Sequence, residues 1–238
     1  MKEYINIAFI PARSGSKRIK DKNIRSLSGK PLLSYTIESA LNSGFYSRIF
    51  IITDSKEYAK IAVTYGAELL KLRPSKISGD NSPDIEWVKW IFDVLEEKNI
   101  EFDTFSILRP TSPFRTKETY LRAFNLFFSI PNIHSLRAVE PVDQHPGKMW
   151  VITDDTMVPL LPFKNNNVLW HSNQKPSLPK IYIQNASFEI AWKDTVVKYG
   201  SISGSIVVPF ISLNNEGFDI NEPIDFTIAE NIINNNNK

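Results

Sequence analysis

A cluster of cations follows the first apolar segment of the sequence. The cluster comprises Arg13, Lys17, Arg18, Lys20 and Lys22. Small residues at 14–16 would let the backbone of this segment come close to a ligand. A triphosphate would suit such a loop, and so would bulk solvent around an ordinary basic turn. The segment matches neither G-x-x-x-x-G-K-[ST] nor G-x-G-x-x-G, so the standard phosphate motifs do not decide between the two.

The elements around this loop indicate where it would lie. Apolar stretches predict strands at 6–11, 48–53, 67–72 and 104–110. Helical patterns alternate with them at 30–44, 55–66, 83–99 and 116–130. This order predicts an α/β fold with a mostly parallel sheet and helices on both faces. Open parallel sheets bind ligands at the carboxyl ends of their strands, so the loop after 6–11 is well placed for binding.

Helix boundaries and buried faces are also visible in the pattern. Ser55 is expected to cap its helix, and Gly44 is expected to end the preceding one. In the helix at 116–130 the apolar spacing of Leu121, Phe124 and Phe128 predicts the buried face.

The regular alternation stops near residue 135. A strand is predicted at 135–142, and the segment at about 140–180 is then rich in proline and irregular. Strands return at 180–192 and 204–210, and Pro223 begins a closing helix at 222–234. We therefore predict one domain over 1–238 with an inserted segment at about 140–180, which serves in dimerisation or as a lid.

Composition excludes several classes of protein. The formal charge of +2 is too small for a nucleic-acid or membrane-surface protein, so we expect neither partner. The chain has no cysteine and 3 histidines, which argues against disulfides and zinc. No secretory leader and no run of about 20 apolar residues is visible, so we expect a cytoplasmic protein.

Seven segments resemble the acylneuraminate cytidylyltransferases, the CMP-sialic acid synthetase family. They occur in the family's order and span nearly the whole chain. The segments are PARSGSKRIKDKNI (11–24), IITDS (51–55), LRPSKISGD (72–80), LRPTSPFR (108–115), HPGKMW (145–150), KPSLPKIYIQN (175–185) and FDINEPIDF (218–226).

The resemblance implies a three-layer, Rossmann-like nucleotidyltransferase fold and a specific reaction. The anomeric hydroxyl of a sialic-acid-like nonulosonic acid, a nine-carbon acid sugar, would attack the α-phosphate of CTP. A CMP-sugar and pyrophosphate would result. The partners implied are CTP, the acid sugar and a second copy of the chain in a homodimer.

The resemblance also assigns roles to individual residues. The catalytic residues it implies are Arg13, Lys17, Lys22 and Asp219. The nucleotide-binding residues are Pro11, Ala12, Arg13, Ser16, Lys17, Asn23, Arg73 and Asp80. Taken in isolation, Asn23 would more commonly cap a turn and Arg73 would form a salt bridge at a strand end.

The implied sugar site departs from the family pattern in several places. Its residues are Arg109, Thr111, Ser112, Lys148, Lys175, Gln184 and Asn185. Arg109 stands where many members have glutamine, and Lys175 stands where arginine is usual. Lysine can neutralise a carboxylate but lacks the bidentate fork of arginine. These departures leave the identity of the sugar open.

Mg²⁺ is the cofactor that the resemblance implies, with Asp219 and Asn221 as ligands. Many relatives have aspartate in place of Asn221, and a neutral amide oxygen is a weaker partner for Mg²⁺. Asp219 could instead cap the closing helix. The sequence offers no convincing general base.

Two alternatives remain open. The chain could be a nucleotidyltransferase for another sugar such as Kdo, or a nucleotide-binding protein that has lost catalysis. The substitutions at Arg109, Ala186 and Asn221 suggest the second of these, whereas the retained cations and Asp219 argue against it.

Overall fold

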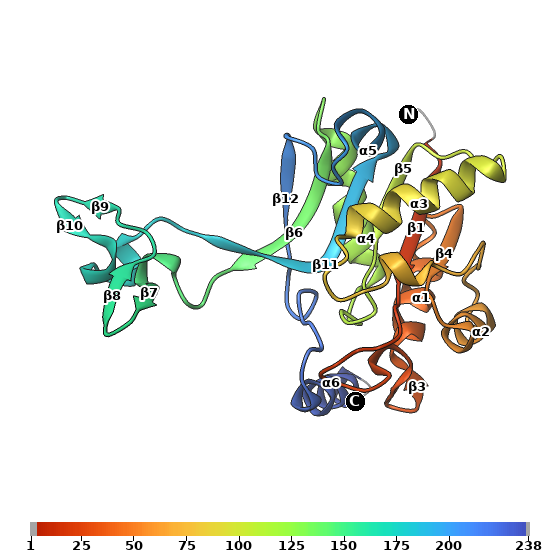
Figure 1. Cartoon of the computed structure of the whole chain (residues 1–238), viewed down its shortest axis with the longest axis horizontal. Helices are drawn as coiled ribbons and strands as arrows, with labels where there is room; N and C mark the ends of the chain where they lie inside the picture. The colour runs from red at the N-terminus through yellow and green to blue at the C-terminus, as the bar shows by residue number, and fades with distance from the viewer. Residues whose placement is uncertain (1–3, 237–238) are drawn as a thin grey trace. The chain divides into compact units, whose positions relative to one another are not determined.

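The computed structural model describes residues 4–236, which divide into two compact units. The first unit comprises residues 1–138 and 185–238 as far as they are described, and the second comprises residues 139–184. The boundaries between the units fall within the strands β6 (Ser135–Pro141) and β11 (Tyr182–Trp192). The chain thus leaves the first unit along β6 and returns along β11 (Figure 1).

A six-stranded sheet forms the centre of the first unit, in the order β12-β6-β11-β5-β1-β4. Its remaining strands are β1 (Asn6–Pro11), β4 (Arg48–Ile52), β5 (Thr104–Ile107) and β12 (Val207–Ile211). β1 pairs in parallel with both β4 and β5, and β11 runs antiparallel to β5. The predicted α/β fold class is therefore confirmed, with β11 as an antiparallel member of a mixed sheet.

Helices cover both faces of this sheet (Figure 1). One apolar core contains side chains of α1 (Leu32–Ser43), α2 (Lys56–Thr64) and α4 (Lys117–Ser129). The core on the opposite face contains side chains of α3 (Asp84–Glu97) and α5 (Lys193–Tyr199). The closing helix α6 (Pro223–Asn236) begins at Pro223, as predicted, and contributes to a third, smaller core.

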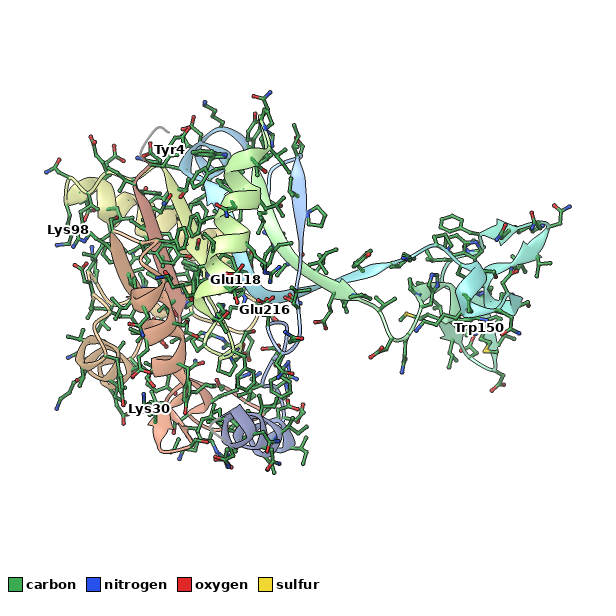
Figure 2. All side chains as sticks on the ribbon, turned by 180° about the vertical axis from the view of Figure 1, so that it is seen from behind. Tyr4, Lys30, Lys98, Glu118, Trp150 and Glu216 are labelled. Carbon is green, nitrogen blue, oxygen red and sulfur yellow. The ribbon has the colours of Figure 1, made fainter. Side chains whose placement is uncertain are left out.

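Most predicted boundaries hold to within a few residues, because local capping sets them. The Ser55 hydroxyl accepts the amide hydrogen of Tyr58 and caps α2. Gly44 ends α1 at φ 75°, in the left-handed region. Glu216, labelled in Figure 2, accepts hydrogen bonds from Thr119 and Arg122 of α4 and so ties the segment before α6 to that helix.

Two local predictions are wrong. Residues 67–72 form no strand, and only Glu68 bridges to Phe50 of β4. Leu69 is exposed, so the apolar pattern there does not mark a buried edge. In α4 the buried aromatics are Tyr120, Phe124 and Phe127, whereas Leu121 and Phe128 are exposed.

The second unit is built from short hairpins. β7 (Trp150–Thr153) pairs antiparallel with β8 (Thr156–Pro159), and β9 (Lys164–Asn165) pairs antiparallel with β10 (Val168–Leu169). The remaining short hairpin, β2 (Ser26–Leu27) with β3 (Lys30–Pro31), lies in the first unit. None of the helices in the described part of the chain has the length and apolar character of a membrane span.

Candidate active site

The basic loop leaves β1 in a conformation that the neighbouring strand β4 determines. The amide of Ala12 donates to the Ile52 carbonyl at 2.9 Å, which continues the parallel ladder past the end of β1. The Ser14 amide and hydroxyl then donate to the two carboxylate oxygens of Asp54, at 2.7 and 2.8 Å. Gly15 follows with φ 77°, a conformation that costs glycine little. The loop is therefore an ordered structure that turns back over the carboxyl end of the sheet.

Two of its cations converge on one carboxylate. Arg13 Nη2 lies 2.6 Å from Asp80 Oδ1, and Lys17 Nζ lies 2.5 Å from Asp80 Oδ2. Hydrogen bonds from Lys17 and Arg13 hold the pKa of Asp80 below its ordinary value. The Lys17 side chain is 80% exposed, so it is free to exchange this partner for a ligand anion. Asp80 thus neutralises cations that a phosphate group could also engage.

Lys22 connects the same loop to the C-terminal part of the chain. Its Nζ donates to the Ile220 carbonyl at 2.7 Å, and the Ile220 amide donates to the Thr111 carbonyl at 2.9 Å. Burial lowers the pKa of Lys22, and the nearby Asp219 carboxylate opposes that effect. Three segments that are distant in sequence therefore meet at the carboxyl edge of the sheet.

The two carboxylate oxygens of Asp219 differ in their hydrogen bonding. Oδ2 accepts a hydrogen bond from Asn221 Nδ2 at 2.6 Å. Oδ1 is buried and has no hydrogen-bond partner in the described part of the chain. At the start of α6, the Asp225 carboxylate accepts the backbone amides of Asn221 and Glu222, the two residues before the helix, at 2.7 and 2.8 Å, and no backbone amide of the described chain donates to Asp219. Asp219 is thus not consumed by helix capping.

A pocket of about 270 Å³ opens at this edge. The predicted site residues that line it are Pro11, Arg13, Ser16, Lys22, Asn23, Arg73, Asp80, Arg109 and Thr111. Gly79, Ser82, Asp84 and Pro110 complete the lining. Ala12 and Ser112 are buried behind this surface, and the Ser112 hydroxyl has no hydrogen-bond partner among residues 4–236. The structure thus brings most of the predicted nucleotide residues together.

Arg73 and Asn23 are both buried polar side chains of this pocket. Arg73 Nε donates to the Ile77 carbonyl at 2.8 Å, and its guanidinium lies over the Trp87 ring at 5.8 Å. No carboxylate in the described chain forms an ion pair with Arg73, so it is not a strand-end salt bridge. Asn23 Nδ2 donates to the Arg13 carbonyl at 3.2 Å, which stabilises the basic loop from within.

Arg109 belongs to a partly buried network of alternating charges. Its Nη2 lies 2.5 Å from Asp84 Oδ2 and 3.3 Å from Glu189 Oε1. Glu189 in turn pairs with Arg137 at 2.8 Å, and Asp84 accepts a hydrogen bond from Trp87 Nε1 at 2.7 Å. Burial would raise the pKa of Asp84, but Arg109 and the Trp87 hydrogen bond hold it below its ordinary value. Arg109 therefore lines the pocket while Asp84 and Glu189 neutralise its charge.

The remaining predicted sugar residues are distributed over both units. Lys148 Nζ donates to the carbonyls of His171 and Asn173, and Lys175 Nζ donates to the Asp143 carbonyl at 2.5 Å. Both lysines, with the exposed Gln184, belong to the second unit. Asn185 belongs to the first unit, where its Nδ2 donates to Ser212 Oγ at 3.0 Å.

Sequence reasoning missed several residues of this site. Asp54 and Asp84 were assigned no role, although Asp54 directly follows a predicted strand at the carboxyl edge of the sheet. That position was a usable signal for Asp54. Glu189 lies inside a strand pattern, and nothing in the local sequence distinguishes a buried carboxylate there from an exposed one.

Comparison with known proteins identifies the family. Residues 7–151 match the sequence profile described as Cytidylyltransferase. The chain is 34% identical over 230 residues to CMP-N,N'-diacetyllegionaminic acid synthase of Legionella pneumophila, with 95% of each chain covered. It is 32% identical over 229 residues to post-translational flagellin modification protein B of Campylobacter coli, covering 96% of this chain and 94% of that one.

A longer relative and two solved structures agree. N-acylneuraminate cytidylyltransferase of Escherichia coli is 31% identical over 223 residues, which cover 94% of this chain and 51% of that protein. The fold is similar to that of CMP:2-keto-3-deoxy-manno-octonic acid synthetase complexed with CTP, with a TM-score of 0.70, 14% identity, and coverage of 98% of this chain and 99% of that one. It is also similar to 4-diphosphocytidyl-2C-methyl-D-erythritol synthase from Anaerococcus prevotii, with a TM-score of 0.65, 13% identity, and coverage of 97% and 99%. These two structures support the fold alone, whereas the profile and the full-length relatives together show that the chain belongs to the cytidylyltransferase family.

Proposed function

We propose that this cytidylyltransferase transfers CMP from CTP to the anomeric hydroxyl of a sialic-acid-like nonulosonic acid, such as N-acetylneuraminate or a legionaminate. The sugar oxygen forms a bond to the α-phosphorus while the bond from that phosphorus to the bridging oxygen of pyrophosphate breaks. Pyrophosphate leaves, and the hydroxyl proton passes to water. The observation that carries this proposal is the convergence of the basic loop, the Thr111 loop and the Asp219 segment through Lys22 and Ile220.

The cations of the basic loop suit a triphosphate. Arg13, Lys17 and Lys22 would stabilise the charge that develops on the phosphates, and a preformed arrangement makes this stabilisation effective. Asp80 would release Arg13 and Lys17 to the phosphates as they enter. Because Asp80 pairs with both cations, it also limits their mutual repulsion in the free enzyme.

The cytosine ring suits the wall formed by Arg73 and the backbone of Pro11 and Ala12. Arg73 is held by Ile77 and Trp87, so its guanidinium is already oriented before a base arrives. Asn23 donates a hydrogen bond to the Arg13 carbonyl and would thereby fix the position of the phosphate-binding loop relative to the base-binding wall.

Asp219 and Asn221 suit Mg²⁺ as the cofactor. Residues 4–236 contain no group of three or more His, Asp or Glu side chains arranged to hold a metal ion, so an all-protein cage is not offered. Mg²⁺ nevertheless commonly takes one or two carboxylates and completes its shell with waters and substrate phosphates. The buried, unpartnered Oδ1 of Asp219 fits that role. When bound, the ion would supply charge neutralisation at the phosphates.

The acid sugar suits the side of the pocket formed by Arg109 and Thr111, with Ser112 and Asn185 from the same unit. Lys148, Lys175 and Gln184 lie in the second unit, and their role in sugar binding stays a prediction. Arg109 places a cation, paired with Asp84 and Glu189, where many relatives have a neutral amide, so the substituents of the acid sugar stay open.

We also propose a homodimer formed through the second unit. Its hairpin β7-β8 exposes Val151, Ile152, Met157 and Val158, with Ile152 75% exposed. Trp150, at the start of the same hairpin, is labelled in Figure 2. A second copy of the chain would remove this apolar surface from water.

Pyrophosphate release with each nucleotide and a panel of acid sugars tests the function. We expect release with CTP plus a nonulosonic acid and none with UTP. Release with Kdo as the only effective acceptor would favour the Kdo alternative. CTP binding without turnover on any acid sugar would indicate a protein that has lost catalysis.

A further inference from the structure

Arg115 is a buried cation directly behind the pocket. It ends the segment that follows β5, and only 4% of the residue is exposed. Its side chain makes four hydrogen bonds within 3.1 Å, and every acceptor is uncharged. The acceptors are the carbonyls of Ser187, Ser112 and Arg109 and the hydroxyl of Thr36.

In the described part of the chain the Arg115 guanidinium forms no ion pair, although the Asp219 carboxylate interacts with it electrostatically. Burial lowers the pKa of Arg115, yet a guanidinium starts so high that it keeps its proton at neutral pH. A buried charge is costly unless it is paired, so an unpaired one at this position calls for a physical reason.

The contacts of Arg115 connect it to the pocket through the loop at 109–112. It holds the carbonyls at both ends of this loop, and Arg109, Pro110 and Thr111 line the pocket. Thr111 also accepts the Ile220 amide, next to Asp219. The Arg115 side chain itself is absent from the pocket lining, so it would act on a ligand through the loop and through its electric field.

We propose that Arg115 is a positioning residue that supplies a permanent positive potential for the triphosphate while it holds the loop in place. This inference rests on the proposed function, because it assumes that the pocket binds CTP. In a protein interior a charge is weakly screened, so a guanidinium without an ion-pair partner favours anions in an adjacent site. A carboxylate partner would cancel that potential, which explains why uncharged acceptors surround it.

A purely structural role makes a different prediction. If Arg115 only holds the loop in place, replacing it should weaken the binding of all nucleotides by the same factor. If its charge acts on the phosphates, the decrease in affinity should grow with the number of charges on the nucleotide. The ratio of CTP affinity to CMP affinity therefore separates the two roles, and a calorimetric titration in magnesium-free buffer measures it.

Three variants and a matched control complete the experiment. Arg115→Met removes the charge and the hydrogen bonds, and Arg115→Lys keeps the charge but loses the fork. Thr36→Val removes one acceptor of Arg115 and leaves its charge. Arg48→Met is the control. Arg48 is the first residue of β4, at the amino ends of the parallel strands and away from the pocket at their carboxyl ends, and it pairs with Glu68.

We expect Arg115→Met to reduce the ratio of CTP affinity to CMP affinity about tenfold, because the ligands differ by about two charges. Arg115→Lys, Thr36→Val and Arg48→Met should keep the wild-type ratio to within about twofold. If Arg115→Met does not fold, Arg115→Lys still tests the inference. A large decrease in the ratio of CTP affinity to CMP affinity in Arg115→Lys, where the charge is present, would overturn it.

The remaining outcomes separate this inference from the proposed function. A wild-type enzyme that prefers CTP over CMP, with the same preference retained in Arg115→Met, contradicts only the role of Arg115. A wild-type enzyme with no preference for CTP over CMP contradicts the triphosphate site itself, and both proposals are then wrong.

Discussion

The Nζ atom of Lys22 lies 2.7 Å from the carbonyl oxygen of Ile220, a residue 198 positions later in the chain. This contact joins the basic loop after β1 to the segment that carries Asp219. Because the Ile220 amide also bonds to Thr111, the contact fixes all three loops of the candidate active site relative to one another. A triphosphate bound there would be within reach of cations from one end of the chain and a carboxylate from the other.

Lys17→Ala should reduce kcat/KM for CTP by about 10- to 100-fold and change the melting temperature by less than about 2 °C. The side chain is 80% exposed and contributes little to packing, so its charge matters mainly to the ligand. Steady-state kinetics and thermal denaturation measure the two effects. Lys20→Ala, an exposed lysine of the same loop, serves as the control with unchanged kinetics. A collapse of thermal stability in Lys17→Ala would indicate a structural role instead.

Lys22 should take up a proton when CTP binds at alkaline pH. Burial places its pKa in the free enzyme below the ordinary lysine value of 10.5. An anion nearby favours the charged form and raises that pKa, so between the two values binding must take up a proton. Titration calorimetry in two buffers of different ionisation enthalpy, without magnesium, detects the uptake. Lys22→Arg should abolish it, because arginine stays protonated, and equal uptake in that variant would exclude Lys22 as its source.

Asp219→Asn should lose most activity, by about 100-fold or more, and excess Mg²⁺ should not restore it. The substitution keeps the shape and removes the charge of the oxygen that has no partner in the described chain. Glu222→Gln is the control, since Glu222 is exposed and its one ion pair among residues 4–236 is with Arg18 at 3.2 Å. Activity of Asp219→Asn at the wild-type level would remove Asp219 from the mechanism.

Arg109→Gln should lower the free energy of unfolding by about 1–3 kcal/mol at neutral pH, because it leaves a buried carboxylate with fewer partners. Glu189 is only 3% exposed and would keep Arg137 alone, while Asp84 would keep the Trp87 hydrogen bond. Urea denaturation measures this change. Arg18→Gln, which breaks an exposed pair with Glu222, should cost less than about 0.5 kcal/mol. The same Arg109→Gln variant should change KM for the acid sugar more than KM for CTP.

The double variant Ile152→Lys with Met157→Glu should convert a dimer into monomers at micromolar concentration. Ile152 and Met157 are paired across β7-β8 and are 75% and 56% exposed, so charges there would oppose burial against a second copy. Sedimentation velocity measures the change, and Thr153→Lys at the hairpin end is the control. A wild-type chain that sediments as a monomer would contradict the proposed homodimer.

The sequence by itself determined the α/β class, most of the order of the main helices and strands in the first unit, and the loop that carries the cations. These follow from local causes: apolar periodicity, the Ser55 cap, and glycine at Gly44 where the backbone turns left-handed. The candidate residues of the pocket were also accessible, since ligands of such sheets gather at the carboxyl ends of strands and the motifs resemble one family.

Only the tertiary structure decided which side chains share a partner. The alternating charges of Asp84, Arg109 and Glu189 come from a helix, a loop and a strand, and no local pattern relates them. The same holds for the buried Arg115, whose four acceptors lie on three separate segments. Periodicity reports which face of an element is apolar, but the partner of a buried charge depends on how distant segments pack, and packing is a property of the whole chain.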